Sequence, residues 1–144
     1  MSIREDGISG TLSEVFEKCA ENEVLSAEEL MKGVAQGTIA ITKNIHHDFS
    51  KIIAIGKNTK TKINANIGSS KDMSGVEGEL LKLKVAVDAG ADTVMDLSMG
   101  ADLDEIRRAI LEECPVPLGT VPIYQVAAEV VEDRSGDIVD MSVD

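Results

Sequence analysis

The fold is decided by the stretch KINANIG at residues 62–68, in which apolar and polar side chains alternate before a glycine. Such alternation predicts a strand, because neighbouring side chains of a strand point to opposite faces of its sheet. Two more strand-like stretches follow, TVMDL at 93–97 and LGTVPIY at 118–124. Helical periodicity fills the intervals at 74–89 and 102–112. Strands that alternate with helices in this way predict an α/β fold with a parallel sheet.

Start and stop signals flank the two predicted helices. Ser74–Glu77 and Asp102–Glu105 have the spacing of a capping box, and Gly90 stands where the first helix should end. A further helical stretch is expected near residues 125–131, after the third strand. The pattern thus predicts three consecutive βα units.

The residues before Thr61 have a different sequence pattern. Capping-box spacing recurs at Thr11–Glu14 and Ser26–Glu29, each ahead of an apolar helical stripe. Two β-branched stretches, 38–42 and 51–55, then predict a small strand pair joined by a polar turn. We therefore divide the chain into an N-terminal helical/β segment, residues 1–60, and a βα segment, residues 61–144.

Three parallel strands do not make a closed sheet. They leave an exposed edge, and a (β/α)₈ TIM-type barrel typically takes about 250 residues. The pattern predicts an incomplete barrel, represented here by its first βα units.

Composition narrows the functions that are plausible. The 14 Lys and Arg against 26 Asp and Glu give a net charge of −12, which disfavours binding to nucleic acid or to an anionic membrane surface. No apolar run reaches membrane-spanning length, and residues 1–7 lack a signal-peptide core. Cys19 and Cys114 are far apart and form no CxxC pattern, which is typical of reduced thiols in a cytosolic protein. We expect a cytoplasmic protein.

Three residues near the ends of the predicted strands are candidates for binding. Asn66 ends the first strand, Met95 lies in the second, and Tyr124 ends the third. Barrel enzymes build their sites at the carboxyl ends of their strands. The residues alone leave other roles open, since Asn at a strand end often forms a turn and Met often fills a core.

Other polar groups give weaker signals. The turn Gly68–Ser70 could offer amides to a phosphate. His46 and His47 are adjacent, so in a strand they would point apart, and a solvated turn is the simpler interpretation. Four acidic residues of the 102–113 region are most simply an exposed helix face: Asp104, Glu105, Glu112 and Glu113.

Three blocks of sequence carry a resemblance to a known family. Residues 62–68 (KINANIG), 90–98 (GADTVMDLS) and 115–125 (PVPLGTVPIYQ) resemble consecutive motifs of the phosphomethylpyrimidine synthase (ThiC) family, in the family's order and spacing. The resemblance is strongest from Thr61 to Gln125 and weaker before it. Ser69 stands where Asn is usual.

The resemblance implies a radical S-adenosylmethionine enzyme of thiamine biosynthesis. Such an enzyme converts 5-aminoimidazole ribotide to 4-amino-5-hydroxymethyl-2-methylpyrimidine phosphate in a (β/α)₈ barrel behind an N-terminal domain. The family's substrate-contacting Asn, Met and Tyr match Asn66, Met95 and Tyr124. The resemblance also implies a [4Fe–4S] cluster on a CxxCxxxxC motif and a zinc ion bound by two histidines in the complete enzyme.

The cluster motif is absent from these 144 residues, so the isolated chain is expected to be inactive. A fragment of the enzyme is the leading hypothesis, acting as a homo-oligomer or with a complementing C-terminal chain. The alternative is a non-catalytic truncated paralogue that serves as a ligand-binding or regulatory module.

Overall fold

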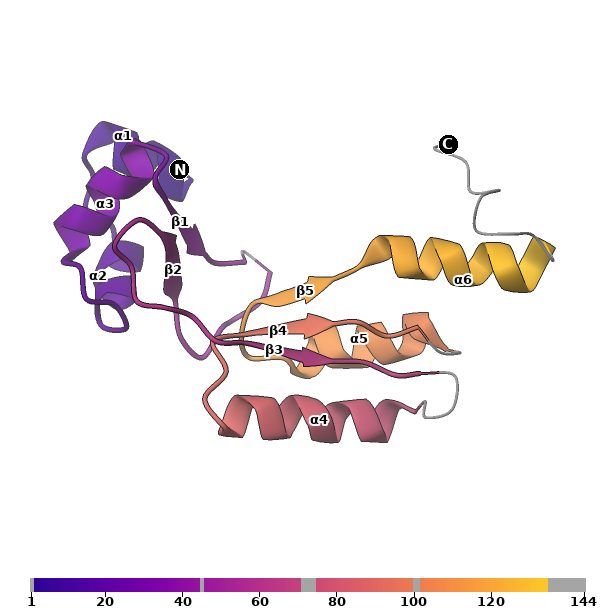
Figure 1. The fold of residues 1–144 in the computed structure, drawn as a ribbon. Coiled ribbons are helices and arrows are strands. Elements are labelled where there is room, and N and C mark those ends of the chain that lie inside the picture. Colours follow the sequence, from indigo (N-terminus) through magenta and orange to yellow (C-terminus); the bar gives the residue numbers. More distant parts are fainter. Residues whose placement is uncertain (1, 45, 71–74, 100–101, 135–144) are drawn as a thin grey trace. The chain divides into compact units, whose positions relative to one another are not determined.

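The computed structural model describes residues 2–44, 46–70, 75–99 and 102–134 (Figure 1). The chain divides into two compact units. The N-terminal unit runs to Ile63 and includes Pro115–Pro117, whereas the C-terminal unit begins at Asn64 and holds the remaining residues.

The N-terminal unit combines helices with a two-stranded sheet. The two strands pair antiparallel, from Ile39 opposite Gly56 to Thr42 opposite Ile53, which confirms the predicted strand pair. The elements are α1 (Ile3–Ser9), α2 (Glu14–Ala20), α3 (Ala27–Ala35), β1 (Ile39–Thr42) and β2 (Ile53–Gly56).

One of the two capping boxes predicted in this unit is confirmed. At the start of α3, Ser26 Oγ accepts from the Glu29 amide and the Glu29 carboxylate accepts from the Ser26 amide. The Thr11–Glu14 box is wrong, because α2 begins only at Glu14 with Ser13 as its N-cap. Thr11 instead places its hydroxyl 2.8 Å from that of Ser9.

The core of the N-terminal unit is small and almost without aromatic side chains. Phe16 and Cys19 of α2 are fully buried, as is Leu30 of α3. Helix α3 contacts α1, α2 and β1, so its apolar face is the centre of the unit. The buried cluster consists of Phe16, Cys19, Leu30, Val34, Ile39 and Ala54.

A buried ion pair ties the loop after α2 to the segment that leads into the second unit. The side chain of Glu23 is fully buried and lies 2.7 Å from Lys62 Nζ. Its two carboxylate oxygens also accept from the amides of Ala54 and Lys60, at 3.0 and 2.9 Å. Burial alone would raise the pKa of Glu23, but Lys62 and the two amides together lower it below 4.5.

We predict that Glu23→Gln destabilises the chain by about 3 kcal/mol at pH 7, because it leaves Lys62 buried without its counter-charge. A lowered folded-state pKa gives stability that is present above pH 4.5 and is lost as pH falls through the lowered value. The difference between wild type and variant should therefore shrink below pH 4.5. Urea unfolding over a pH series measures it.

Glu14→Gln is the matched control, since Glu14 pairs with Lys18 at 2.7 Å on the exposed face of α2. Such exposed pairs contribute little to stability, because solvent screens both charges. Equal losses in the two variants would contradict the structural role given to Glu23.

The C-terminal unit contains the predicted parallel sheet. Strand order is β3-β4-β5, and both pairings are parallel. In Figure 1 the three arrows run side by side in one direction. The elements are β3 (Asn64–Ile67), α4 (Val76–Asp88), β4 (Thr93–Asp96), α5 (Leu103–Glu113), β5 (Leu118–Thr120) and α6 (Pro122–Arg134).

Helices α4 and α5 cover one face of this sheet. Leu83 of α4 is buried, as are Ile106 and Ile110 of α5. On β4 burial alternates, with Val94 and Asp96 buried and Thr93 and Met95 half-buried. The two predicted helices at 74–89 and 102–112 are thus confirmed, with their apolar stripes turned inward.

Three details of the predicted elements are corrected. The third strand ends at Thr120 rather than near Tyr124, because Pro122 begins α6, where its fixed φ and missing N–H suit the first helical position. Ile63 lies outside β3 and is 64% exposed, although the alternation in KINANIG placed it in the strand. Asp102 is the N-cap of α5 but makes no side-chain capping bond. Ser74 lies outside the described residues.

Within the part of the chain that the structure describes, no helix is both long enough and apolar enough to cross a bilayer.

Candidate functional site

The face of the sheet away from α4 and α5 carries a row of polar side chains. Asn64 and Asn66 of β3 are exposed on this face. Asn64 Nδ2 donates to Asn66 Oδ1 at 2.8 Å, and Thr93 Oγ1 of β4 donates to Asn64 Oδ1 at 2.8 Å. These bonds hold the side chain of Asn66 in a defined position while leaving it open to a ligand.

Met95 is the direct neighbour of Asn66. The parallel register pairs Asn66 with Met95 and Met95 with Gly119 of β5. A Cβ built on Gly119 would lie 2.9 Å from Met95 Sδ, so the Met95 side chain lies over Gly119. The absence of a side chain at Gly119 therefore makes the space that Met95 occupies.

Beyond the strands, the chain segments that follow β3 and β4 stay in contact. The Leu97 amide donates to Ile67 O at 2.8 Å, the Ser69 amide to Ser98 Oγ at 3.0 Å, and the Met99 amide to Ser69 O at 3.1 Å. Since Ser98 takes up the Ser69 amide, that amide is not available for the phosphate cradle that the Gly68–Ser70 turn suggested.

Gly68 is required where the two segments approach. Its φ is +155°, and a Cβ there would lie 2.7 Å from the Leu97 carbonyl carbon and 2.8 Å from the Ser98 nitrogen. From α4, Lys82 Nζ donates to Gly68 O at 2.9 Å and pairs with the buried Glu79 carboxylate at 2.6 Å. The turn is thus fixed from both sides.

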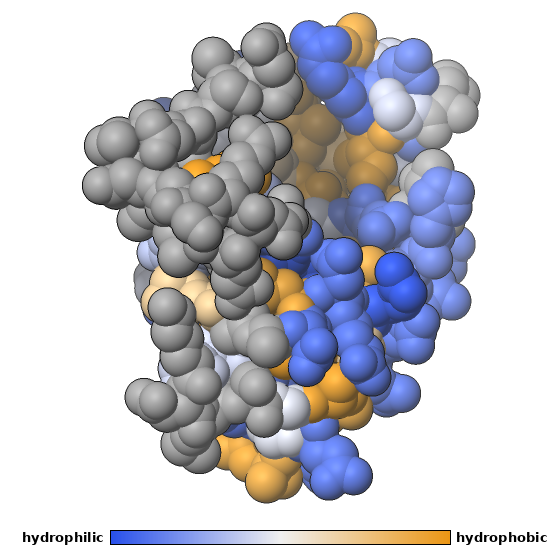
Figure 2. Space-filling view, turned by 90° about the vertical axis from the view of Figure 1, so that its right-hand side faces the viewer, coloured by the Kyte–Doolittle hydropathy of each residue, from blue (hydrophilic) through white to orange (hydrophobic). Residues whose placement is uncertain are grey.

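Tyr124 lies in the first turn of α6, four residues after β5 ends, and is 38% exposed. The next residue, Gln125, accepts from Arg107 Nη1 of α5 and donates to Asp104 Oδ1 at 3.1 Å. Figure 2 faces the side toward which the strands point, and there hydrophobic residues are visible among hydrophilic ones. A surface of mixed polarity suits a ligand with both ring and polar groups.

The three candidate residues from the sequence therefore lie in consecutive βα units. Asn66 and Met95 are side by side, and Tyr124 follows the third strand. Sequence patterns gave no signal for Glu79, Asp96 and Arg107, whose charges are buried or half-buried around this edge. For Asp96 and Glu79, their position among apolar residues of a strand or helix was the feature that could have indicated burial. The four acidic residues predicted on α5 are exposed, as expected.

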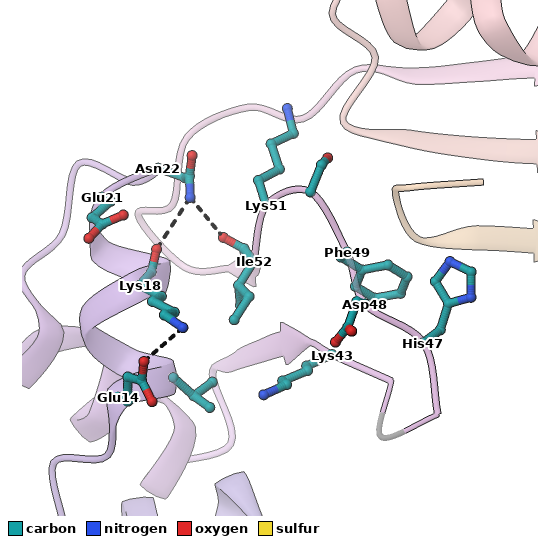
Figure 3. Close-up of a pocket in the computed structure, with 12 residues that line it drawn as sticks. Glu14, Lys18, Glu21, Asn22, Lys43, His47, Asp48, Phe49, Lys51 and Ile52 are labelled. Carbon is teal, nitrogen blue, oxygen red and sulfur yellow. Dashed lines mark hydrogen bonds and ion pairs between the residues drawn. The ribbon is translucent and has the colours of Figure 1, made fainter. Parts of the chain in front are cut away.

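A separate pocket of about 390 Å³ lies within the N-terminal unit (Figure 3). Asn22 lines the pocket, and its Nδ2 donates to the carbonyls of Lys18 and Ile52 at 3.2 and 3.3 Å. Its acidic and basic side chains balance, so it favours neither a cationic nor an anionic ligand. The charged lining consists of Glu14, Glu21 and Asp48 with Lys18, Lys43 and Lys51.

Comparison with known proteins identifies the chain. A sequence model of the Radical SAM ThiC family matches residues 2–144. The chain belongs to the radical SAM ThiC family. It is 63% identical over 144 residues to the phosphomethylpyrimidine synthase of Desulfotalea psychrophila, covering all of this chain and 33% of that protein.

Two further ThiC relatives show the same coverage. The chain is 46% identical over 142 residues to the phosphomethylpyrimidine synthase of Thermococcus kodakarensis, covering 99% of the chain and 33% of the relative. The chain is 50% identical over 135 residues to the phosphomethylpyrimidine synthase of Desulforudis audaxviator, covering 94% of the chain and 31% of the relative. The chain spans about a third of the length of the curated relatives it matches.

The cysteines present do not fit an iron–sulfur cluster. The whole sequence has two cysteines, Cys19 and Cys114, and both are buried. Burial raises the pKa of the Cys19 thiol to about 11, with the Glu23 carboxylate adding to the effect, whereas cluster ligands are thiolates. Across the described residues, no three His, Cys, Asp or Glu side chains gather so as to hold a metal ion. We therefore assign no step of cluster chemistry to this segment.

The two glycines of the site should respond differently to alanine. We predict that Gly68→Ala costs roughly 1–3 kcal/mol, because the new Cβ meets backbone atoms at a positive φ. Gly119→Ala should cost less than about 1 kcal/mol, because only the flexible end of Met95 must move to another rotamer. Chemical denaturation of both variants measures the difference. A larger loss in Gly119→Ala would contradict the packing described here.

Proposed function

We propose that residues 1–144 serve as the first third of a phosphomethylpyrimidine synthase and provide part of its substrate site. The supporting observation is the register of β3 and β4, in which Asn66 and Met95 are adjacent on the face away from α4 and α5. In this proposal β3, β4 and β5 are the first three strands of a (β/α)₈ barrel. Residues 61–144 contribute these βα units, and residues 1–60 form the domain that precedes them.

The proposed substrate is 5-aminoimidazole ribotide, which carries an imidazole ring, a ribose and a phosphate. Asn66 hydrogen-bonds the ribotide, since its amide is exposed and offers both a donor and an acceptor. Met95 lines the pocket with a polarisable thioether, and Tyr124 offers a ring face and a hydroxyl. The product is 4-amino-5-hydroxymethyl-2-methylpyrimidine phosphate.

The radical chemistry belongs to other parts of the complete enzyme in this proposal. A [4Fe–4S] cluster and S-adenosylmethionine supply the radical, and a zinc site lies with the family's two histidines. The residues of this chain bind and orient the ribotide. A partner is then needed, either the remaining two thirds of the protein or a second subunit that brings the cluster to the barrel.

The role of Asn66 can be tested in the full-length enzyme. We expect Asn66→Ala to raise KM for the ribotide about tenfold, the effect of losing one hydrogen bond that is made to the bound substrate. Glu77→Ala, in the exposed first turn of α4, is the control and should leave KM unchanged. Steady-state kinetics with the ribotide as the varied substrate measure both. An unchanged KM in Asn66→Ala would remove this residue from the site.

The division of labour can be tested with the 144-residue chain itself. After anaerobic reconstitution with iron and sulfide, we expect no [4Fe–4S] absorbance and no turnover, because two buried thiols cannot replace three spaced thiolates. Adding the remaining part of the enzyme as a separate chain should restore turnover. Stoichiometric iron in the isolated chain would contradict the proposal, and a chain that binds the ribotide but is never complemented would favour a regulatory paralogue.

A further inference from the structure

A buried carboxylate stands at the carboxyl end of β4, directly after Met95. The Asp96 side chain is fully buried, and its Oδ1 accepts from the Ser98 amide at 2.9 Å. Its Oδ2 lies 3.8 Å from Arg107 Nε of α5. Within the described part of the chain neither of these two atoms has a hydrogen-bond partner, so the ion pair between them is what compensates the buried charge.

Arg107 connects this carboxylate to α6. Its Nη1 donates to Gln125 Oε1, and Gln125 Nε2 donates to Asp104 Oδ1 at 3.1 Å. The guanidinium is planar and presents several donors in a fixed fork, so one side chain can face Asp96 with Nε and Gln125 with Nη1. A lysine at this position could not do both.

The first turn of α6 carries two partly exposed side chains. Ile123 is 58% exposed and Tyr124 is 38% exposed. The Tyr124 amide donates to Val121 O at 3.0 Å, a bond within the turn itself. The contacts of Gln125 with Arg107 and Asp104 link this turn to α5.

We propose that Asp96, Arg107 and Gln125 are positioning residues that hold Tyr124 at the carboxyl edge of the sheet. Through Ser98, which accepts from the Ser69 amide at 3.0 Å, the same network reaches the segment that follows Asn66. This inference rests on the proposed function, since it assigns a role to residues that act through Tyr124.

A double-mutant cycle in the full-length protein tests the inference, with 5-aminoimidazole ribotide as the titrated ligand in calorimetry. We expect Gln125→Leu to weaken binding about tenfold, the size of effect typical of coupled neighbours. The double variant Gln125→Leu/Tyr124→Ala should bind no more weakly than Tyr124→Ala alone. The melting temperature of Gln125→Leu should stay at the wild-type value, which separates positioning from a general loss of structure.

Arg107→Gln with Arg108→Gln as its matched control tests the other half of the network. Arg108 is the exposed neighbour on the same helix, so its replacement should leave ribotide affinity unchanged. Arg107→Gln should weaken binding as Gln125→Leu does. Arg107→Gln also leaves Asp96 unpaired and can unfold the sheet edge. If it does not fold, the result for Gln125→Leu decides the test.

The outcomes separate this inference from the proposed function. If Tyr124→Ala weakens binding but Gln125→Leu does not, or if the two effects are additive, the positioning network is overturned and the substrate site stands. If Tyr124→Ala leaves affinity unchanged, the substrate contact itself is wrong, and the inference falls with it.

Discussion

The parallel register between β3 and β4 is the constraint on which the candidate site depends. It places Asn66 opposite Met95, and the next pairing places Met95 over Gly119. Because side chains alternate along a strand, a shift of one residue would turn Asn66 toward α4 and α5 and bring Ile67 to the open face. Gly68 secures this register, since its contact with Leu97 and Ser98 lets the chain segments beyond the strands continue to pair. The glycine after the strand is thus as important to the site as the polar residues within it.

Each unit also contains buried carboxylates that pair with a lysine or an arginine. In the N-terminal unit, Glu23 pairs with Lys62, which precedes β3, and accepts hydrogen bonds from two backbone amides. In the C-terminal unit, Glu79 fixes Lys82 against the Gly68 carbonyl, and Asp96 faces Arg107. Glu23 and Lys82 also bind backbone groups of loop residues, the amide of Lys60 and the carbonyl of Gly68. A buried ion pair adds little net stability, and its value here is the single geometry that it selects.

Much of the C-terminal unit could be predicted from the sequence because its signals are local. The alternation in NANI at 64–67 and the helical stripe of Val76, Leu80, Leu83 and Val87 both follow from burial on one face. The end of the third strand could not be predicted from apolar content, because Pro122 overrides it by starting α6. The partner of Asp96 could not be predicted either, since Arg107 lies on another element. Asn66 and Met95 could be proposed as site residues from their place near strand ends, whereas the residues that support them could not.

The position of the cysteines explains why ligand binding and radical chemistry fall to different parts of a ThiC enzyme in our proposal. Cys19 lies in the core of the N-terminal unit, where burial keeps its proton on at neutral pH. Cys114 is buried at the end of α5, at the opposite end of that helix from the carboxyl edge of the sheet. A redox cluster needs correctly spaced thiolate ligands, whereas a ribotide site needs rigid polar groups on a sheet. In our proposal the first βα units meet the second requirement through hydrogen-bonded asparagines and a fixed glycine turn.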